Sequence, residues 1–114
     1  MYPDAFVRCG PRDGRRTSVD DPVVVVVEVL SEGTLKHDLI RKRLAYEVMP
    51  SLRRIVYVST DEARLDMRVR GPDGIWGDET AEGLESAAQM PEIGVSLPLA
   101  EIYKDTELAA APAA

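Results

Sequence analysis

The sequence is poor in the residues that build disulfides and zinc sites. It contains one cysteine, Cys9, and one histidine, His37. A lone cysteine excludes a disulfide within the chain and argues against a zinc cluster, so we interpret Cys9 as a small buried apolar residue. His37 and its neighbour Lys36 fall beside a predicted loop. We interpret both as solvated residues, and His37 as a poor candidate for a general base.

The sequence also lacks long apolar stretches. It has no run of about 18 apolar residues, so no transmembrane helix is predicted. The first residues do not show the charged-then-apolar pattern of a signal peptide. The 114 residues, of which 45% are hydrophobic, suffice for one small domain. We therefore expect a soluble cytoplasmic protein with one domain over residues 1–108 and a disordered Ala-rich tail over residues 109–114.

Charge is unevenly distributed along the chain. The formal net charge of −6 by itself argues against a nucleic-acid partner. Residues 1–60, however, hold ten Lys/Arg and eight Asp/Glu, whereas residues 61–114 hold four and twelve. The basic residues form two groups, Arg8, Arg12, Arg15 and Arg16 in one and Lys36, Arg41, Lys42, Arg43, Arg53 and Arg54 in the other. Two interpretations stay open: a phosphate-binding first half, and ordinary solvated charges.

Hydrophobic periodicity and turn residues predict mainly strands. The expected strands are residues 5–9, 23–30, 54–59, 64–70, about 75–80 and 95–97. One main helix is expected over about 34–49 and a short one over about 98–103, while residues 10–21 and 81–94 are expected to be irregular.

Glu28 is the one charged residue in a predicted strand that is otherwise apolar. The run Val23–Leu30 includes five consecutive valines, which is typical of a strand covered on both faces. A carboxylate on such a strand is costly unless it is paired or bound to a metal. Glu28 is therefore the first candidate for a functional residue.

The main predicted helix carries polar residues inside an apolar stripe. Thr34 is its expected N-cap and Pro50 ends it. One stripe consists of Leu35, Asp38, Leu39, Lys42, Tyr46 and Met49, and a second apolar strip of Ile40, Leu44 and Val48. We therefore expect Asp38 and Lys42 to face the sheet, and the helix to need a neighbour on each side.

Asp4 and Glu28 are the candidate metal ligands. If their two strands are adjacent and antiparallel, both carboxylates lie at one end of a sheet. Two close carboxylates repel unless a cation lies between them, and oxygen-only ligands suit Mg²⁺ or Mn²⁺. Such a metal polarises a phosphate and activates water. A nearby lysine, here Lys42, would stabilise the developing negative charge.

The ordered motifs of the chain resemble a known nuclease family. Pro3-Asp4, then Glu28-Val29-Leu30-Ser31, then Asp38, Lys42 and Tyr46 at four-residue spacing, are similar to the Uma-two family of restriction endonucleases in the PD-(D/E)XK superfamily. The stretch from Pro50 to Arg53, the Pro72-Asp73-Gly74 turn before Trp76, and Leu97–Tyr103 extend the similarity over residues 2–108.

The resemblance implies a fold and a site. The fold would be α+β, a restriction-endonuclease-like mixed sheet packed by one main helix, with the family's N-terminal helix and strand missing from this chain. Asp4, Glu28 and the Val29 carbonyl would hold Mg²⁺ or Mn²⁺, with Lys42 as the catalytic lysine and Asp38 and Tyr46 in support. The superfamily's usual lysine position is Leu30 here. The substrate would be DNA, and a homodimer would cover the exposed sheet edge.

Other interpretations stay open beside this one. The chain could be a non-catalytic remnant that binds DNA or protein, or a small β-rich structural protein; a natural fragment, a misplaced start and a decayed copy would each explain its beginning. Asp4 could be a turn former, Glu28 the partner of an arginine, and Tyr46 a core residue. Asp38 and Lys42 could form an ordinary helical ion pair.

Overall fold

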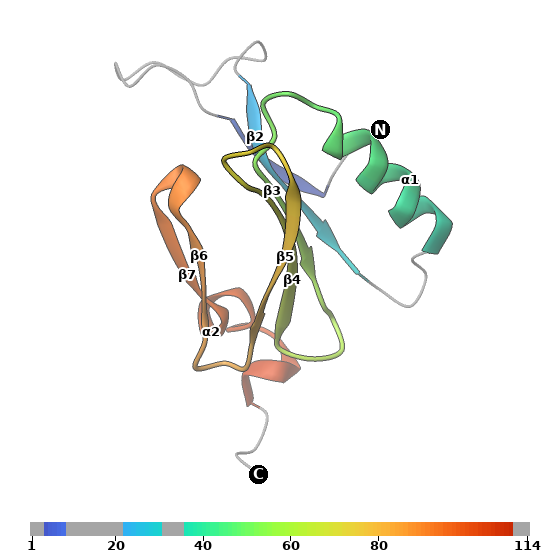
Figure 1. Cartoon of the computed structure of the whole chain (residues 1–114). Helices are drawn as coiled ribbons and strands as arrows, with labels where there is room; N and C mark the ends of the chain where they lie inside the picture. The colour runs from blue at the N-terminus through green and yellow to red at the C-terminus, as the bar shows by residue number, and fades with distance from the viewer. Residues whose placement is uncertain (1–3, 9–21, 31–35, 111–114) are drawn as a thin grey trace.

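The protein has a five-stranded sheet with one long helix on one face and a small hairpin on the other (Figure 1). The computed structural model describes residues 4–8, 22–30 and 36–110. The main sheet consists of β1 (Ala5–Arg8), β2 (Val23–Val29), β3 (Arg54–Val58), β4 (Arg64–Arg70) and β5 (Trp76–Glu82). The remaining elements are α1 (Lys36–Glu47), β6 (Ala87–Met90), η1 (Pro91–Ile93), β7 (Val95–Pro98), α2 (Leu99–Ile102) and η2 (Glu107–Ala110).

The sheet is mixed, with spatial order β1-β2-β3-β4-β5. Only β2 and β3 run parallel, and α1 lies in the crossover that joins them. The other neighbours, β1–β2, β3–β4 and β4–β5, are antiparallel. The predicted α+β class with one main helix is therefore confirmed, and β1 and β2 are adjacent and antiparallel as expected.

Each face of the sheet has its own apolar core. Beneath α1 the buried residues are Val26, Tyr46, Leu52 and Ile55. The opposite face carries a larger core, to which the β6–β7 hairpin and α2 contribute: Val25, Val56, Leu65, Met67, Ala81, Ala88, Met90, Leu99 and Tyr103. Val25 and Val26 thus point to opposite cores, which explains the uninterrupted valine run of β2.

The structure corrects the prediction that residues 81–94 are irregular. Strand β5 continues to Glu82, and the segment then forms β6 and η1. Ala88 and Met90 alternate into the core, while Gln89 between them is exposed. Ala109 and Ala110, expected to begin a disordered tail, form the end of η2. The expected N-cap Thr34, the loop arginines 12, 15 and 16, and Cys9 lie outside the described residues.

The second apolar strip of α1 is not covered within the described part of the chain. Ile40, Leu44 and Val48 are 53%, 56% and 78% exposed. Asp38 is also exposed, although the helical wheel placed it in the stripe facing the sheet. The helix therefore packs through one face only, the face that carries Tyr46.

The C-terminal end of α1 is held by the β4–β5 hairpin. The Arg70 guanidinium donates hydrogen bonds to the carbonyls of Glu47, Met49 and Pro50. The Trp76 indole also donates to the Glu47 carbonyl, and the Arg70 guanidinium lies 4.8 Å from the centre of the Trp76 ring. Because the last carbonyls of a helix lack partners within it, these donors stabilise the helix end and fix its position on the sheet.

A buried arginine joins the second layer to the sheet. Arg54 on β3 is fully buried, and its guanidinium donates to both Glu92 carboxylate oxygens and, at 3.2 Å, to Glu79. Burial alone would lower the pKa of Arg54, but Glu92 and Glu79 outweigh it and raise that pKa above its usual value. Arg54 is therefore an internal ion-pair residue, which removes it from the predicted group of phosphate-binding cations.

We expect Arg54→Met to lower the free energy of unfolding by about 3–5 kcal/mol, because it leaves the Glu92 carboxylate buried without its partner. Urea denaturation, followed by the fluorescence of the single tryptophan Trp76, measures this. Arg53→Met, at the exposed neighbouring position, should change stability by less than about 0.5 kcal/mol. The double variant Arg54→Met/Glu92→Met should regain much of the loss, and equal effects of the two single arginine variants would contradict a structural role for the pair.

Candidate functional site

Glu28 is buried between β2 and α1 but keeps two polar partners. It is 4% exposed. The Tyr46 hydroxyl donates a hydrogen bond of 2.6 Å to its Oε1 atom. The Lys42 ammonium lies 3.4 Å from Oε2 and 3.5 Å from Oε1. Since Lys42 and Tyr46 are four residues apart on α1, one face of the helix delivers both to the same carboxylate.

Asp4 reaches the same end of β2 from the neighbouring strand. It directly precedes β1, in which Ala5 pairs with Val27. The Asp4 Oδ2 atom accepts a 2.6 Å hydrogen bond from the backbone N–H of Val29, the residue after Glu28. Asp4 itself is exposed. The site therefore combines a solvent-facing carboxylate with a buried one, at the end of the strand.

Tyr46 is electrostatically coupled to both acids. Burial, the hydrogen bond to Glu28 and the charges of Glu28 and Asp4 all raise the pKa of Tyr46 well above its usual value of 10. The phenol thus stays protonated and donates to Glu28 throughout the neutral range. This arrangement also answers the sequence-based alternatives for two residues. Among the described residues, Glu28 is paired with a lysine and a tyrosine and with no arginine, and Tyr46 is at once a core residue and a partner of the site.

The structure brings together four of the candidate residues, Asp4, Glu28, Lys42 and Tyr46. Val29 adjoins them through its backbone N–H, and its side chain is exposed. Asp38 lies one turn before Lys42 on the solvent-exposed part of α1. Leu30, at the position where the superfamily places its lysine, is half-buried, and the ammonium of Lys42 approaches Glu28 from the helix instead.

Sequence reasoning missed two neighbours of the site, Tyr57 and Arg43. In the parallel register of β2 and β3, Tyr57 lies directly beside Glu28. Burial raises the pKa of Tyr57 above its usual value; the charge of Arg43 lowers it, and that of Glu28 raises it. The alternation of Ile55 and Tyr57 on the predicted strand is the signal that could have placed Tyr57 on the face of Glu28.

The donor set fits a magnesium-type ion better than zinc. Within the described ranges, no group of three or more His, Cys, Asp and Glu side chains is arranged to hold a metal. Asp4 and Glu28 supply two carboxylates at one end of β2, where the Val29 N–H holds Asp4. Mg²⁺ characteristically uses one or two carboxylates and keeps water or substrate phosphate as its other ligands. Zinc requires three or four protein ligands, usually with nitrogen or sulfur.

We expect Tyr46→Phe to lower the free energy of unfolding by about 1.5–3 kcal/mol, because it removes a hydrogen bond to a buried carboxylate. Since the folded pKa of Tyr46 is raised, the stabilisation is complete below pH 10 and declines above it, where the unfolded tyrosine loses its proton first. Urea denaturation from about pH 8 to 11 should show the wild-type advantage shrinking at the alkaline end. A constant difference across that range would contradict the coupling.

Comparison with known proteins places the chain in a family. The sequence profile of Uma2, described as "Putative restriction endonuclease", matches residues 1–100. An uncharacterized protein of Synechocystis, slr1290, is 31% identical over 105 residues, which are 90% of this chain and 53% of that protein. The chain thus spans about half the length of this relative. No helix within residues 4–8, 22–30 and 36–110 is long and apolar enough to cross a membrane.

A solved structure shares the fold. It is the crystal structure of a protein from Anabaena variabilis titled as a putative nuclease belonging to DUF820, with a TM-score of 0.59 and 10% sequence identity. The similarity covers 73% of this chain and 45% of that one. The resemblance inferred from the motifs is confirmed over most of the sequence: the chain belongs to the Uma2 family of restriction-endonuclease-like proteins.

Proposed function

We propose that this protein is a metal-dependent nuclease that hydrolyses DNA phosphodiester bonds at the site formed by Asp4, Glu28 and Lys42. One observation carries the proposal: a buried glutamate with a lysine beside it adjoins an exposed aspartate at the same strand end. Membership of the Uma2 family supports the nuclease class. The metal, the substrate and the roles of the individual residues are the parts that we propose.

Asp4, Glu28 and the Val29 carbonyl would hold Mg²⁺ or Mn²⁺. When bound, this ion would polarise the scissile phosphate and lower the pKa of the attacking water. Asp4 is suited to binding from the solvent side because its carboxylate is exposed and already oriented by the Val29 N–H. Glu28 is suited to a fixed geometry because its Oε1 atom accepts the short Tyr46 bond, which restricts rotation of the carboxylate.

Lys42 is the residue that would stabilise charge at the phosphate. Its ammonium contacts Glu28 at 3.4 Å, while about a third of the side chain (32%) remains exposed to an incoming substrate. A cation held on the scissile side of the site would favour the negative charge that develops in the transition state. Tyr46 positions Glu28, and Asp38, one turn before Lys42, would orient the lysine.

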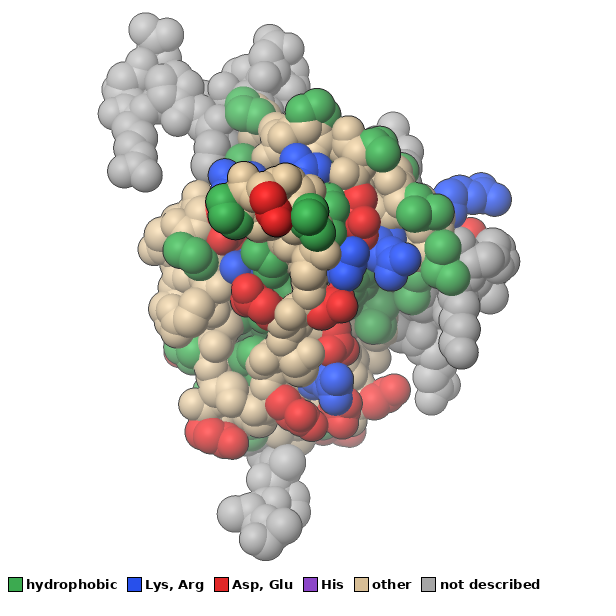
Figure 2. Space-filling view, in the orientation of Figure 1, with side chains coloured by type: hydrophobic (Ala, Val, Ile, Leu, Met, Phe, Trp, Pro, Cys, Tyr) green, Lys and Arg blue, Asp and Glu red, His purple; other side chains and the backbone are tan. Residues whose placement is uncertain are grey.

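The surface charge is compatible with a polyanionic substrate at one end of the molecule. Figure 2 shows acidic side chains gathered toward the lower end of one face, with most Lys and Arg in its upper half. Lys42, which contacts Glu28, and Arg43, whose charge acts on Tyr57, provide two cations of α1 next to the site. A locally basic surface attracts DNA although the whole chain carries a charge of −6.

The metal can be tested with a matched pair of glutamate variants. We expect Mg²⁺ or Mn²⁺ to raise the melting temperature of the wild type and to support nicking of supercoiled plasmid, and Glu28→Ala to abolish both effects. Glu101→Ala, at an exposed glutamate on α2, should retain both. Nicking by Glu28→Ala in excess chelator would contradict the assignment, and metal binding without nicking by the wild type would favour a non-catalytic DNA- or protein-binding module.

A variant of Lys42 should show whether this residue acts in the chemical step or in metal binding. We expect Lys42→Ala to keep the metal-induced rise in melting temperature, because both carboxylates remain, but to lower kcat for plasmid nicking by about 100-fold. Lys104→Ala, an exposed lysine beyond α2, serves as the control and should leave kcat unchanged. An equal loss of metal binding and kcat in Lys42→Ala would instead assign the lysine a structural role through Glu28.

A further inference from the structure

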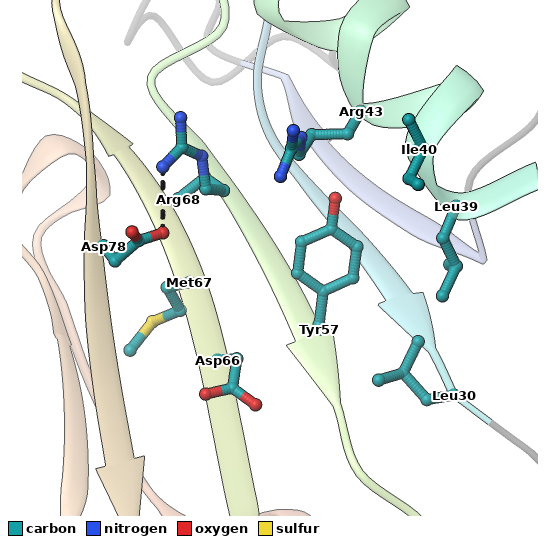
Figure 3. A pocket seen from close by; sticks show the side chains of 9 residues that line it. All are labelled: Leu30, Leu39, Ile40, Arg43, Tyr57, Asp66, Met67, Arg68 and Asp78. Carbon is teal, nitrogen blue, oxygen red and sulfur yellow. Dashed lines mark hydrogen bonds and ion pairs between the residues drawn. The ribbon is translucent and has the colours of Figure 1, made fainter. Parts of the chain in front are cut away.

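A groove opens beside the candidate site, between α1 and the neighbouring strands. Its volume is about 300 Å³. Leu39, Ile40 and Arg43 of α1 form one side, Asp66, Met67, Arg68 and Asp78 of β4 and β5 the other, and Leu30 and Tyr57 complete the lining. Figure 3 shows the Tyr57 ring in the middle of the groove, with its hydroxyl directed toward Arg43. Binding pockets for small ligands occupy roughly 300–1,000 Å³, so the groove is at the small end of that range.

The two arginines of the groove differ in how fully their donors are used. Arg68 donates to Asp78 at 2.9 Å and to Glu47 at 3.1 Å, which fixes it to the groove wall. The Arg43 Nε atom is buried and has no hydrogen-bond acceptor within the described part of the chain. Its nearest acid is Glu47 at 3.5 Å, whose Oε2 atom already accepts from Arg68. The Arg43 side chain is 42% exposed although its Nε atom is buried, so an external acceptor would reach it through the terminal NH₂ groups of the guanidinium.

The groove adjoins the candidate site. Tyr57 pairs with Glu28 in the parallel register, so the groove begins one strand away from the buried carboxylate. Arg43 follows Lys42 on α1, and their side chains diverge, one to the groove and one to Glu28. The charges of both Arg43 and Glu28 act on the Tyr57 phenol, which places the three groups in one electrostatic environment. A substrate positioned by Lys42 would therefore extend into this groove.

The groove offers the contacts that a nucleotide needs. The terminal NH₂ groups of an arginine are suited to a phosphate, which they bind through two parallel hydrogen bonds. A tyrosine ring provides a face on which a base stacks without regard to its identity. Asp66 and Asp78 on the opposite wall carry carboxylate acceptors, although each is already engaged by an arginine. The neighbouring Leu39 and Ile40 supply apolar contact for a sugar.

We propose that this groove is a nucleotide subsite, in which Arg43 binds the backbone phosphate next to the scissile one and Tyr57 contacts the attached base or sugar. The inference rests on the proposed nuclease function. It specifies which part of the DNA the protein binds, namely the nucleotide next to the scissile phosphate. Arg43 is a substrate-binding residue in this scheme, distinct from the metal site, and the subsite recognises a nucleotide without reading its sequence.

The test compares arginine variants for the binding of a fluorescein-labelled single-stranded DNA oligonucleotide, whose bases are free to stack, measured by anisotropy in EDTA over a range of KCl concentrations. We expect Arg43→Gln to weaken binding about tenfold, because it loses a charge-assisted phosphate contact. The slope of log K against log salt should become shallower by about 0.7, as for one lost phosphate contact on a single strand. Arg43→Lys should bind less tightly than the wild type but keep its slope, because the charge remains. Arg41→Gln, at an exposed position outside the groove, should bind within about twofold of the wild type.

A second pair of variants tests whether the aromatic ring of Tyr57 contributes to DNA binding. Tyr57→Phe should keep the affinity, and Tyr57→Leu should lower it about tenfold through lost stacking. Circular dichroism and the melting temperature establish that each variant is folded. With Mg²⁺ present, Arg43→Gln should raise KM for nicking more than it lowers kcat, in contrast to Lys42→Ala.

The outcomes distinguish the subsite from the nuclease proposal. If the wild type nicks DNA and Glu28→Ala does not, but Arg43→Gln binds like Arg41→Gln, the subsite is disproved and the nuclease proposal stands. The same conclusion follows if Tyr57→Leu binds like Tyr57→Phe. If the wild type neither binds nor nicks DNA, both proposals fail.

Discussion

The structure around the candidate site depends on compensating one buried charge. Glu28 lies on a strand whose neighbours Val25 and Val26 fill cores on opposite faces, so its carboxylate is shielded from water on the side of α1. An isolated carboxylate there would cost several kcal/mol. The helix has to deliver Lys42 and Tyr46 to that carboxylate together, which fixes its rotation about its axis. The same requirement explains why the helix packs through this one face.

Hydrogen bonds and ion pairs fix the positions of the helix and the hairpin on the sheet, which apolar contacts alone would leave variable. On the side of α1, Arg70 and Trp76 bind the carbonyls at the end of the helix and so fix its distance from β4. On the other side, Arg54 reaches from β3 to Glu92 next to the hairpin. Hydrophobic burial is non-directional, whereas these bonds have defined geometry. Together these bonds fix how the layers on both faces pack against the sheet. They thereby set the position of Lys42 relative to β2.

The sequence predicted most of the sheet because strands follow short-range periodicity, and the ordered motifs of the family resemblance indicated the four residues that the structure brings together. The valine run identified β2, and the four-residue spacing of Lys42 and Tyr46 placed both on one helix face. Strand β7 was expected over residues 95–97, but its partner β6 was missed because its core residues, Ala88 and Met90, are weak strand formers among acidic neighbours. The burial of Arg54 was missed because an arginine is usually solvated, and its acids are 25 and 38 residues away. The groove containing Arg43 and Tyr57 depends on how α1 packs against β4 and β5, which no local pattern encodes.

The pairs that define the site are separated along the chain: 25 residues between Asp4 and Val29, 18 between Glu28 and Tyr46, and 14 between Glu28 and Lys42. The β3–β4–β5 meander, by contrast, is made of neighbouring strands joined by short turns. Closing long loops carries a larger entropic cost, which has to be met before their contacts contribute. We therefore expect the meander to form early in folding, and the acidic pair to become a site only when β2 docks against it. In this topology we expect the groove wall, which β4 and β5 form, to be in place before the carboxylates meet.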